Sequence, residues 1–333
     1  MIPPTGRTDG GAAPGRAATS RAARRNALTW ESATSHPSRR RPPAPTPARS
    51  AGTPQNGSLP VVRLSDVFAA LDELYPPAWA ESWDAVGPVT GDPGQDVRRV
   101  LFAVDPLAPV VAEAVAWNAD LIVAHHPLLL RGVTGVAATT PKGRAVHTLI
   151  SNGVALFTAH TNADVADPGV SDALARAVGV TGELRPLVPS ADDPRRGLGR
   201  VGTLPEPTTL AAFTAAVARG LPATAWGVRA AGDPGRTVVT VAVCGGAGDS
   251  LLGAARAAGA DVYLTADLRH HPATEFAEQD GPALVDAAHW ATEWPWLADA
   301  ERRLGALLGP GTLETRVSTL VTDAWSLHDE GVK

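Results

Sequence analysis

The fold is decided by residues 97–127, VRRVLFAVDPLAPVVAEAVAWNADLIVAHHP. The stretch opens with an apolar run at 97–105, continues with a helical pattern over 107–119, and closes with a second apolar run at 120–127. Apolar runs without alternation are typical of parallel strands that are covered on both faces. We therefore predict a strand, a helix and a second strand, which is the building unit of a parallel α/β sheet.

The same order recurs in residues 237–272, TVVTVAVCGGAGDSLLGAARAAGADVYLTADLRHHP. In both units an Ala-Asp pair precedes the second apolar run and a His-His pair follows it. These pairs are Ala119-Asp120 and His125-His126 in the first unit, and Ala260-Asp261 and His270-His271 in the second. The recurrence indicates an internal duplication.

The other segments also alternate between strand and helix patterns, starting with a helix at about 65–75 that Ser65 would cap. We predict an α/β fold of two similar lobes with a dinuclear metal site in the cleft between them. The first lobe would comprise residues 59–165 and 288–333, and the second lobe residues 166–287.

Residues 1–58 are rich in Pro, Ala and Arg and contain almost no periodic apolar positions. Such a segment buries too little surface to offset the entropy of ordering, so we predict that it is disordered. Its Arg-rich, acid-poor composition leaves open an organelle transit peptide. A third alternative is that translation begins near Val61 or Val62.

Composition narrows the class of protein. The net charge is -5, but Met1 to Gly57 carries nine Arg against Asp9 and Glu31, so the remainder is acidic, which disfavours nucleic-acid binding. Cys244 is the sole cysteine, which excludes a disulfide framework and a Cys-based zinc site and favours a reducing, cytoplasmic setting. No apolar run reaches the about 18 residues of a membrane-spanning helix.

Polar clusters follow four of the predicted strands, and most of the chain's nine histidines fall in them. Ligand sites of open α/β sheets form at such strand ends. The clusters are His125-His126, His160 to Asp164, Asp267 to His271, and His289 to Glu293. We expect them to converge, and imidazoles with carboxylates favour Zn, Fe, Mn, Ni or Co without selecting among them.

Adjacent histidines in an ideal strand point to opposite faces, so one ion cannot easily bind both His125 and His126. Two ions about 3.5 to 4 Å apart can, with one histidine on each and carboxylates between them. The alternative for this pair is a polar strand end with exposed rings.

His289 and Glu293 have the spacing of a helical HxxxE motif, but Pro295 opposes a helix there. We therefore place both residues on a loop before a helix that starts near Pro295, where the helix dipole favours a carboxylate. The alternatives are a simple helix-terminal acid for Glu293 and an Asx turn for Asp164.

The segment GGAGDS, residues 245–250, follows a strand and opens a helix. Backbone N–H groups at such a place can hold an anion. The segment matches neither GxGxxG nor the P-loop, so a tight turn is the alternative.

Six motifs together resemble the Nif-three-like family of GTP cyclohydrolase 1 type 2 homologs. They are SWDAVGPVTGDP, ADLIVAHHPLLLRG, AHTNAD, VCGGAGDSL, DVYLTADLRHH and DAAHWATEWP. The resemblance implies two metal ions and a ring-shaped homohexamer. Its metal ligands correspond here to His125, His126, Asp164, His289 and Glu293, the same five that the clusters suggest.

The sequence departs from the family pattern at three positions. Ala85 replaces the Asn of WDN, Ala266 the Gly of TGD, and Trp290 the Tyr of GHY. None of the three is an expected ligand, so the departures bear on substrate preference.

The leading hypothesis is a metal-dependent hydrolase of a nucleotide or related heterocycle. In its GTP cyclohydrolase version, activated water attacks C8 of guanine, and His160 or His271 supplies the proton for ring opening. The alternative is a non-enzymatic metal-handling or adaptor protein. An open coordination position would favour catalysis, and a closed four-ligand geometry would favour a structural site.

Overall fold

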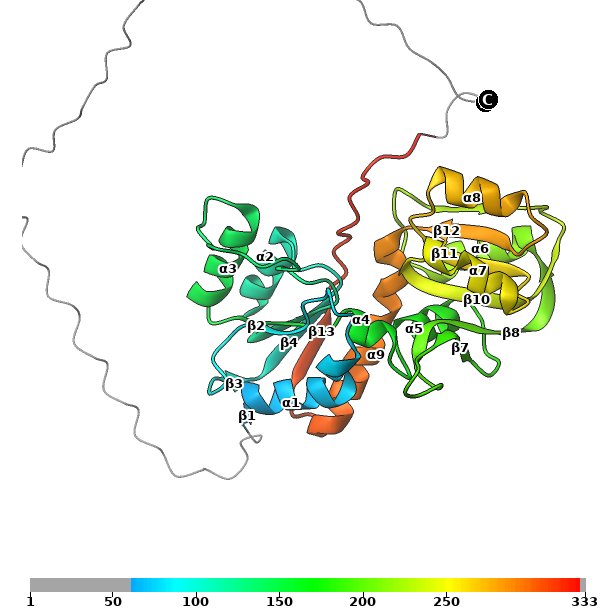
Figure 1. Cartoon of the computed structure of the whole chain (residues 1–333). Coiled ribbons are helices and arrows are strands. Elements are labelled where there is room, and N and C mark those ends of the chain that lie inside the picture. Colours follow the sequence, from blue (N-terminus) through cyan, green and yellow to red (C-terminus); the bar gives the residue numbers. More distant parts are fainter. Residues whose placement is uncertain (1–60, 330–333) are drawn as a thin grey trace, which may run out of the picture. The chain divides into compact units, whose positions relative to one another are not determined.

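A computed structural model describes residues 61–329 of the 333-residue chain. Within this range the backbone forms two larger mixed sheets with helices packed on them (Figure 1). The predicted α/β class is therefore confirmed. The predicted disorder of residues 1–58 concerns a segment outside the described residues.

The first sheet has five strands in the order β13-β4-β5-β6-β2. Four strands run parallel, and β2 is antiparallel to β6. Every residue of β5 and β6 is buried, which explains their uninterrupted apolar runs. The strands are β2 Gly87–Thr90, β4 Arg99–Ala103, β5 Leu121–Ala124, β6 Ala155–Thr158 and β13 Glu314–Val317, and a separate ribbon pairs β1 Val62–Arg63 with β3 Asp96–Val97.

The second sheet has six strands in the order β7-β8-β10-β11-β12-β9. Its centre, β10-β11-β12, is parallel, and the flanking strands are antiparallel. The strands are β7 Arg185–Pro189, β8 Gly197–Thr209, β9 Val228–Ala231, β10 Thr237–Ala247, β11 Val262–Ala266 and β12 Ala283–Ala287. Each of the two predicted strand-helix-strand units thus supplies adjacent parallel strands to one sheet.

Helices cover both faces of each sheet. Apolar side chains of α2 and α3 pack on one face of the first sheet, and those of α1 and α9 pack on the other. On the second sheet, α7 and α8 cover one face, while α5, α6 and α9 cover the opposite one. The longer helices are α1 Leu64–Leu74, α2 Ala108–Trp117, α3 Pro141–Ser151, α5 Val170–Ala177, α6 Leu210–Gly220, α8 His270–Ala277 and α9 His289–Leu308. The shorter ones are η1 Pro77–Trp79, α4 Thr161–Asp164, η2 Asp249–Leu251 and α7 Leu252–Ala257.

The Ala-Asp pair performs the same structural task in both repeated units. The Asp120 carboxylate accepts hydrogen bonds from the backbone N–H groups of Arg98 and Arg99, at 2.7 and 2.9 Å. The Asp261 carboxylate likewise accepts from Val239 and Thr240, at 2.9 and 2.8 Å. Each Asp therefore fixes the start of its parallel strand pair, which is a physical reason for the repeat.

Two local predictions were wrong. The helix expected at about 65–75 is α1, but Ser65 does not cap it: the N-cap is Arg63, whose backbone N–H donates to the Asp66 carboxylate.

The second wrong prediction was the loop at His289 and Glu293, which lie in the first turns of α9 with Pro295 inside the helix. A proline inside a helix lowers the stability of that helix by about 3 kcal/mol. The helix forms nevertheless because Trp296, Leu297 and four further apolar residues along it are buried. Tertiary burial therefore outweighs the local preference of proline.

Arg200 on β8 is a buried charge that links the second sheet to α5. Its guanidinium forms an ion pair with Asp172 at 2.8 Å and donates to the backbone oxygens of Ala166, Gly197 and Gly199. Both charged side chains are at most 6% exposed, so each depends on the other.

Replacing Arg200 with Met should lower the free energy of unfolding by about 3–5 kcal/mol, because Asp172 would remain as a buried and unbalanced charge. Urea unfolding at neutral pH measures the change. Arg98→Met removes an exposed guanidinium and is the matched control, expected to leave the midpoint close to that of the wild type. Equal midpoints for the two variants would contradict the assignment.

Candidate metal centre

Three segments bring the five expected ligand residues together. His125 and His126 directly follow β5, and Asp164 ends the short helix α4 that follows β6. His289 is the first residue of α9, and Glu293 lies one turn further along the same helix face. The strand ends thus supply the side chains, as expected for an α/β sheet.

Glu293 lies at the centre of this group. Its Oε1 is 2.9 Å from Nε2 of His289 and 3.5 Å from Nε2 of His125. Its Oε2 is 3.1 Å from Nε2 of His126. Asp164 Oδ1 lies 3.8 Å from Nε2 of His125, so all five side chains form one cluster.

The expected opposite orientation of His125 and His126 was wrong. Their ring centroids are 5.1 Å apart, and the Nε2 atoms of both rings face Glu293. Both residues lie beyond Ala124, the last residue of β5, in a bend of the chain. The alternation of side chains along a strand therefore does not apply to them.

The three imidazoles of the cluster and the neighbouring His160 each have an oxygen acceptor at Nδ1, at 2.7 to 2.9 Å. These pairs are His125 with the carbonyl of Ala159, His126 with Asp105, His160 with Asp84, and His289 with Asp267. Since these oxygens accept hydrogen bonds, Nδ1 donates, and a neutral ring then presents the lone pair of Nε2. Metal-bound histidines are oriented in this way.

Asp84, Asp105 and Asp267 had no predicted role. The sequence does indicate a site position for two of them, because Asp105 and Asp267 end the apolar runs VLFAVD and VYLTAD. A carboxylate at a strand end can bind an imidazole at a neighbouring one. Which histidine each of them binds depends on strand order, which the sequence does not give.

Two atoms at the centre are buried without a hydrogen-bond partner among the described residues. They are Nε2 of His125 and Oε2 of Glu293. The contact between Glu293 Oε2 and His126 is short, but it lacks hydrogen-bonding geometry. Buried polar atoms are nearly always paired, so these two indicate a binding position for a cation.

The charges of the metal-free cluster depend strongly on one another. Burial alone would lower the pKa of His126, but Glu293 and Asp105 outweigh it and raise that pKa to about 10. Burial is likewise outweighed at His289, where Glu293 and Asp267 raise the pKa to about 11. At Glu293 burial opposes the charge, yet the neighbouring imidazoles hold its pKa well below the usual value. Protons on imidazoles therefore balance Glu293 when no metal is bound.

Donor atoms of five side chains fall into two overlapping sets, within each of which they lie no more than 4.8 Å apart, and Asp164 belongs to neither set. One set is His125, His126 and His160, and the other is His126, His289 and Glu293. Imidazole nitrogens with carboxylate oxygens suit Zn, Fe, Mn, Ni and Co. The residues present therefore fit a divalent metal ion.

Trp296 forms the apolar support of the cluster. It is fully buried, its ring centroid lies 5.2 Å from that of His125, and its Nε1 donates to the hydroxyl of Tyr75 at 3.1 Å. The ring packing and the Ala159 hydrogen bond together restrict the orientation of His125.

Comparison with known proteins identifies the family of the chain. The model of the Duf34/NIF3 (NGG1p interacting factor 3) family matches residues 62–324. The chain belongs to this family. A Streptomyces coelicolor protein named GTP cyclohydrolase 1 type 2 homolog is 58% identical over 270 residues, covering 80% of this chain and 94% of its own. A Mycobacterium tuberculosis protein of the same name is 40% identical, covering 81% of this chain and 98% of its own.

Solved structures of relatives show the same fold. A Bacillus cereus protein related to NIF3 superposes with a TM-score of 0.72 at 24% identity, covering 81% of this chain and 99% of its own. A hypothetical protein from Staphylococcus aureus gives a TM-score of 0.69 at 27% identity, covering 79% and 98%. The resemblance seen in the six motifs is therefore confirmed.

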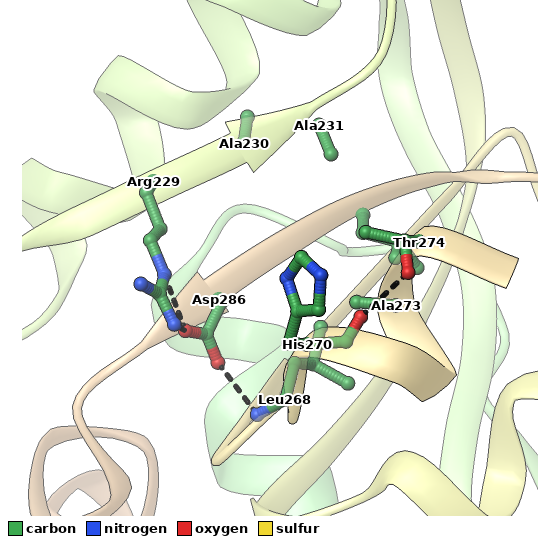
Figure 2. Close-up of a pocket in the computed structure, with 9 residues that line it drawn as sticks. Arg229, Ala230, Ala231, Leu268, His270, Ala273, Thr274 and Asp286 are labelled. Atoms are coloured by element: carbon green, nitrogen blue, oxygen red, sulfur yellow. Dashed lines mark hydrogen bonds and ion pairs between the residues drawn. The ribbon is translucent and has the colours of Figure 1, made fainter. Parts of the chain in front are cut away.

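The second His pair of this NIF3 chain lies apart from the cluster. His270 and His271 begin α8 and are exposed. His270 lines a separate cavity of about 300 Å³, where Figure 2 shows it near the ion pair of Arg229 and Asp286. The sequence repeat thus extends to the Ala-Asp pairs but not to the positions of the His pairs.

The three departures from the family pattern each adjoin a partner or ligand of the cluster. Ala85 follows Asp84, Ala266 precedes Asp267, and Trp290 follows His289. Ala266 and Trp290 are buried, at 0% and 4% exposure, so their side chains act through packing.

Gly246, in the GGAGDS segment, packs directly against the cluster. Its φ is +67°, and a Cβ atom there would lie 2.5 Å from Glu293 Oε1 and 3.1 Å from His289 Nε2. Its N–H donates to Thr292 Oγ1 at 2.9 Å. Only glycine therefore leaves room for Glu293 at this position.

Gly246→Ala should destabilise the protein more than Gly153→Ala. Gly153 has a similar φ of +68° and open space around it, so its substitution measures backbone strain alone, about 1–2 kcal/mol. The additional loss in Gly246→Ala comes from displacement of Glu293. Urea unfolding of both metal-free variants tests this, and equal losses would show that Gly246 does not restrict the carboxylate.

Proposed function

We propose that this protein is a dinuclear metal-dependent hydrolase acting on a nucleotide or a related heterocycle, similar to GTP cyclohydrolase 1 type 2. The observation that carries the proposal is the inward-facing set of imidazole Nε2 atoms around the buried carboxylate of Glu293. The names of the two bacterial relatives, GTP cyclohydrolase 1 type 2 homolog, support the substrate class.

In this proposal the metal ligands are His125, His126, Asp164, His289 and Glu293. Two divalent ions held there would lower the pKa of a water molecule towards about 7. The two donor sets support more than one cation position, and His126 would serve one of them, because only the Nε2 lone pair of its ring is free. Asp105 and Asp267 orient the imidazoles to which they are bonded.

His160 is the proposed proton carrier. Its ring centroid is 5.2 Å from that of His125 and 5.5 Å from that of His126, and Asp84 fixes its Nδ1. Burial and the neighbouring His125 lower the pKa of His160, so its neutral form can accept a proton from water. His271 was the other expected carrier, but its exposed place on α8 favours His160 for the role.

A cavity beside His126 offers space for part of a substrate. Its volume is about 200 Å³, and it is bordered by Asp105, Leu128 and Lys142 among others. Ligand pockets for whole drug-sized molecules usually exceed about 300 Å³, so this cavity suits a ring or another fragment. The predominantly apolar lining suits a heterocycle.

We further propose that the two sheets define two similar lobes, residues 59–165 with 288–333 and residues 166–287, and that the metals lie in the cleft between them. A cytoplasmic homohexamer is the proposed form of the protein. Among the described residues no helix is long and apolar enough to cross a membrane.

Release of formate from GTP tests the proposed reaction. Full-length protein incubated with GTP and Mn²⁺, Zn²⁺ or Fe²⁺ should release formate, and Glu293→Gln should abolish the release because it removes the central charge. Formate is measured by coupled assay, with metal content determined on the same samples. Stoichiometric metal without turnover for GTP and related nucleotides would favour the metal-handling or adaptor alternative.

Metal binding should release protons at pH 8. His126 and His289 have pKa values of about 10 and 11 without metal, so both carry a proton at pH 8 that a bound cation must displace. Apparent metal affinity should consequently rise with pH. Calorimetry with Zn²⁺ in buffers of different ionisation enthalpy measures the released protons, and a heat independent of the buffer would contradict the prediction.

A further inference from the structure

The chain after β13 runs past the proposed metal centre. Ser318 anchors the start of this tail, because its backbone N–H donates to Phe102 on β4 and its hydroxyl to Glu113 on α2, at 2.8 and 2.6 Å. Its carbonyl accepts from Nε1 of Trp294 at 2.9 Å. Residues 318–325, which we name the C-terminal tail, therefore start from a fixed point beside α9.

Thr322 connects this tail to a metal ligand through one intermediate residue. Its hydroxyl donates to Oδ2 of Asp105 at 2.5 Å. The other oxygen of that carboxylate, Oδ1, accepts from Nδ1 of His126 at 2.7 Å. The two hydrogen bonds use both oxygens of Asp105, so they restrict rotation of its carboxylate.

Trp325 holds the far end of the tail. Its ring centroid lies 5.8 Å from that of Trp226, which precedes β9 of the second sheet. Trp226 also contacts Arg229, whose guanidinium lies 4.4 Å from the ring centroid. The same guanidinium pairs with buried Asp286 (Figure 2). The tail thus contacts the fold on both sides of Thr322, through the hydrogen bonds of Ser318 and through the ring of Trp325, which is 60% exposed.

Asp323 places a negative charge next to the centre. One of its oxygens, Oδ2, is buried without a hydrogen-bond partner among the described residues. Burial raises the pKa of Asp323, and this outweighs the lowering by the backbone hydrogen bond from Ala324 and by His289.

We infer that Thr322 is a positioning residue of the metal centre: it holds the Asp105 carboxylate in the orientation that directs Nε2 of His126 towards Glu293. The inference rests on the proposed metal binding. The C-terminal tail itself contains none of the five proposed ligands. Loss of the hydroxyl would free Asp105 to rotate, and the imidazole would lose its fixed direction.

The test compares divalent metal affinity of full-length variants with Co²⁺ as the probe. Its visible absorption reports ligand geometry independently of any enzymatic activity. Thr322→Val should weaken Co²⁺ binding by about 10-fold and change the absorption spectrum. Thr322→Ser retains a hydroxyl and should keep the wild-type affinity and spectrum. Thr319→Val, at an exposed threonine of the same tail, is the matched control and should bind as the wild type does.

A double-mutant cycle separates positioning from general destabilisation. In an Asp105→Ala background, adding Thr322→Val should cause no further loss of Co²⁺ affinity, because the hydroxyl acts only through the carboxylate. Equal affinity for Thr322→Val and wild type would overturn the inference. A loss shared by Thr322→Ser would overturn it too, because that variant retains the hydroxyl. Wild-type protein that binds no Co²⁺, Zn²⁺ or Mn²⁺ would instead reject the proposed function itself.

Discussion

The structure around the site depends on the burial of one carboxylate, that of Glu293. A buried carboxylate is costly unless charged or polar groups surround it, and here three imidazole Nε2 atoms lie within 3.5 Å. These imidazoles come from the end of β5 and the start of α9. Glu293 can therefore be buried only when the end of β5 and the start of α9 lie next to each other.

Helix α9 provides both the chemistry and the packing of this arrangement. Its first turns carry His289 and Glu293, and its buried apolar side belongs to a core that includes residues of both sheets. Trp296 contacts the ring of His125 from this buried side. The same helix thus fixes the ligand positions and buries the surface that stabilises them, which explains how it accommodates Pro295.

The oxygen acceptors at Nδ1 fix the orientation of the histidine rings. They come from the ends of β4 and β11, from Asp84, and from the carbonyl of Ala159, so several chain segments orient the histidines. The C-terminal tail adds Thr322 to Asp105. Such an arrangement leaves little freedom to the rings before a cation binds, which reduces the entropy lost on binding.

The sequence by itself determined the α/β class, the first strand-helix-strand unit, its repeat and the five residues that gather at the centre, because apolar periodicity and residues at strand ends are local properties. It did not determine that His125 and His126 face the same way, that His289 and Glu293 start a helix, or which carboxylate binds which histidine. Those features depend on the bend after Ala124, on the burial of Trp296 and on strand order. Each involves contacts between residues far apart in the chain, and only the tertiary structure decides them.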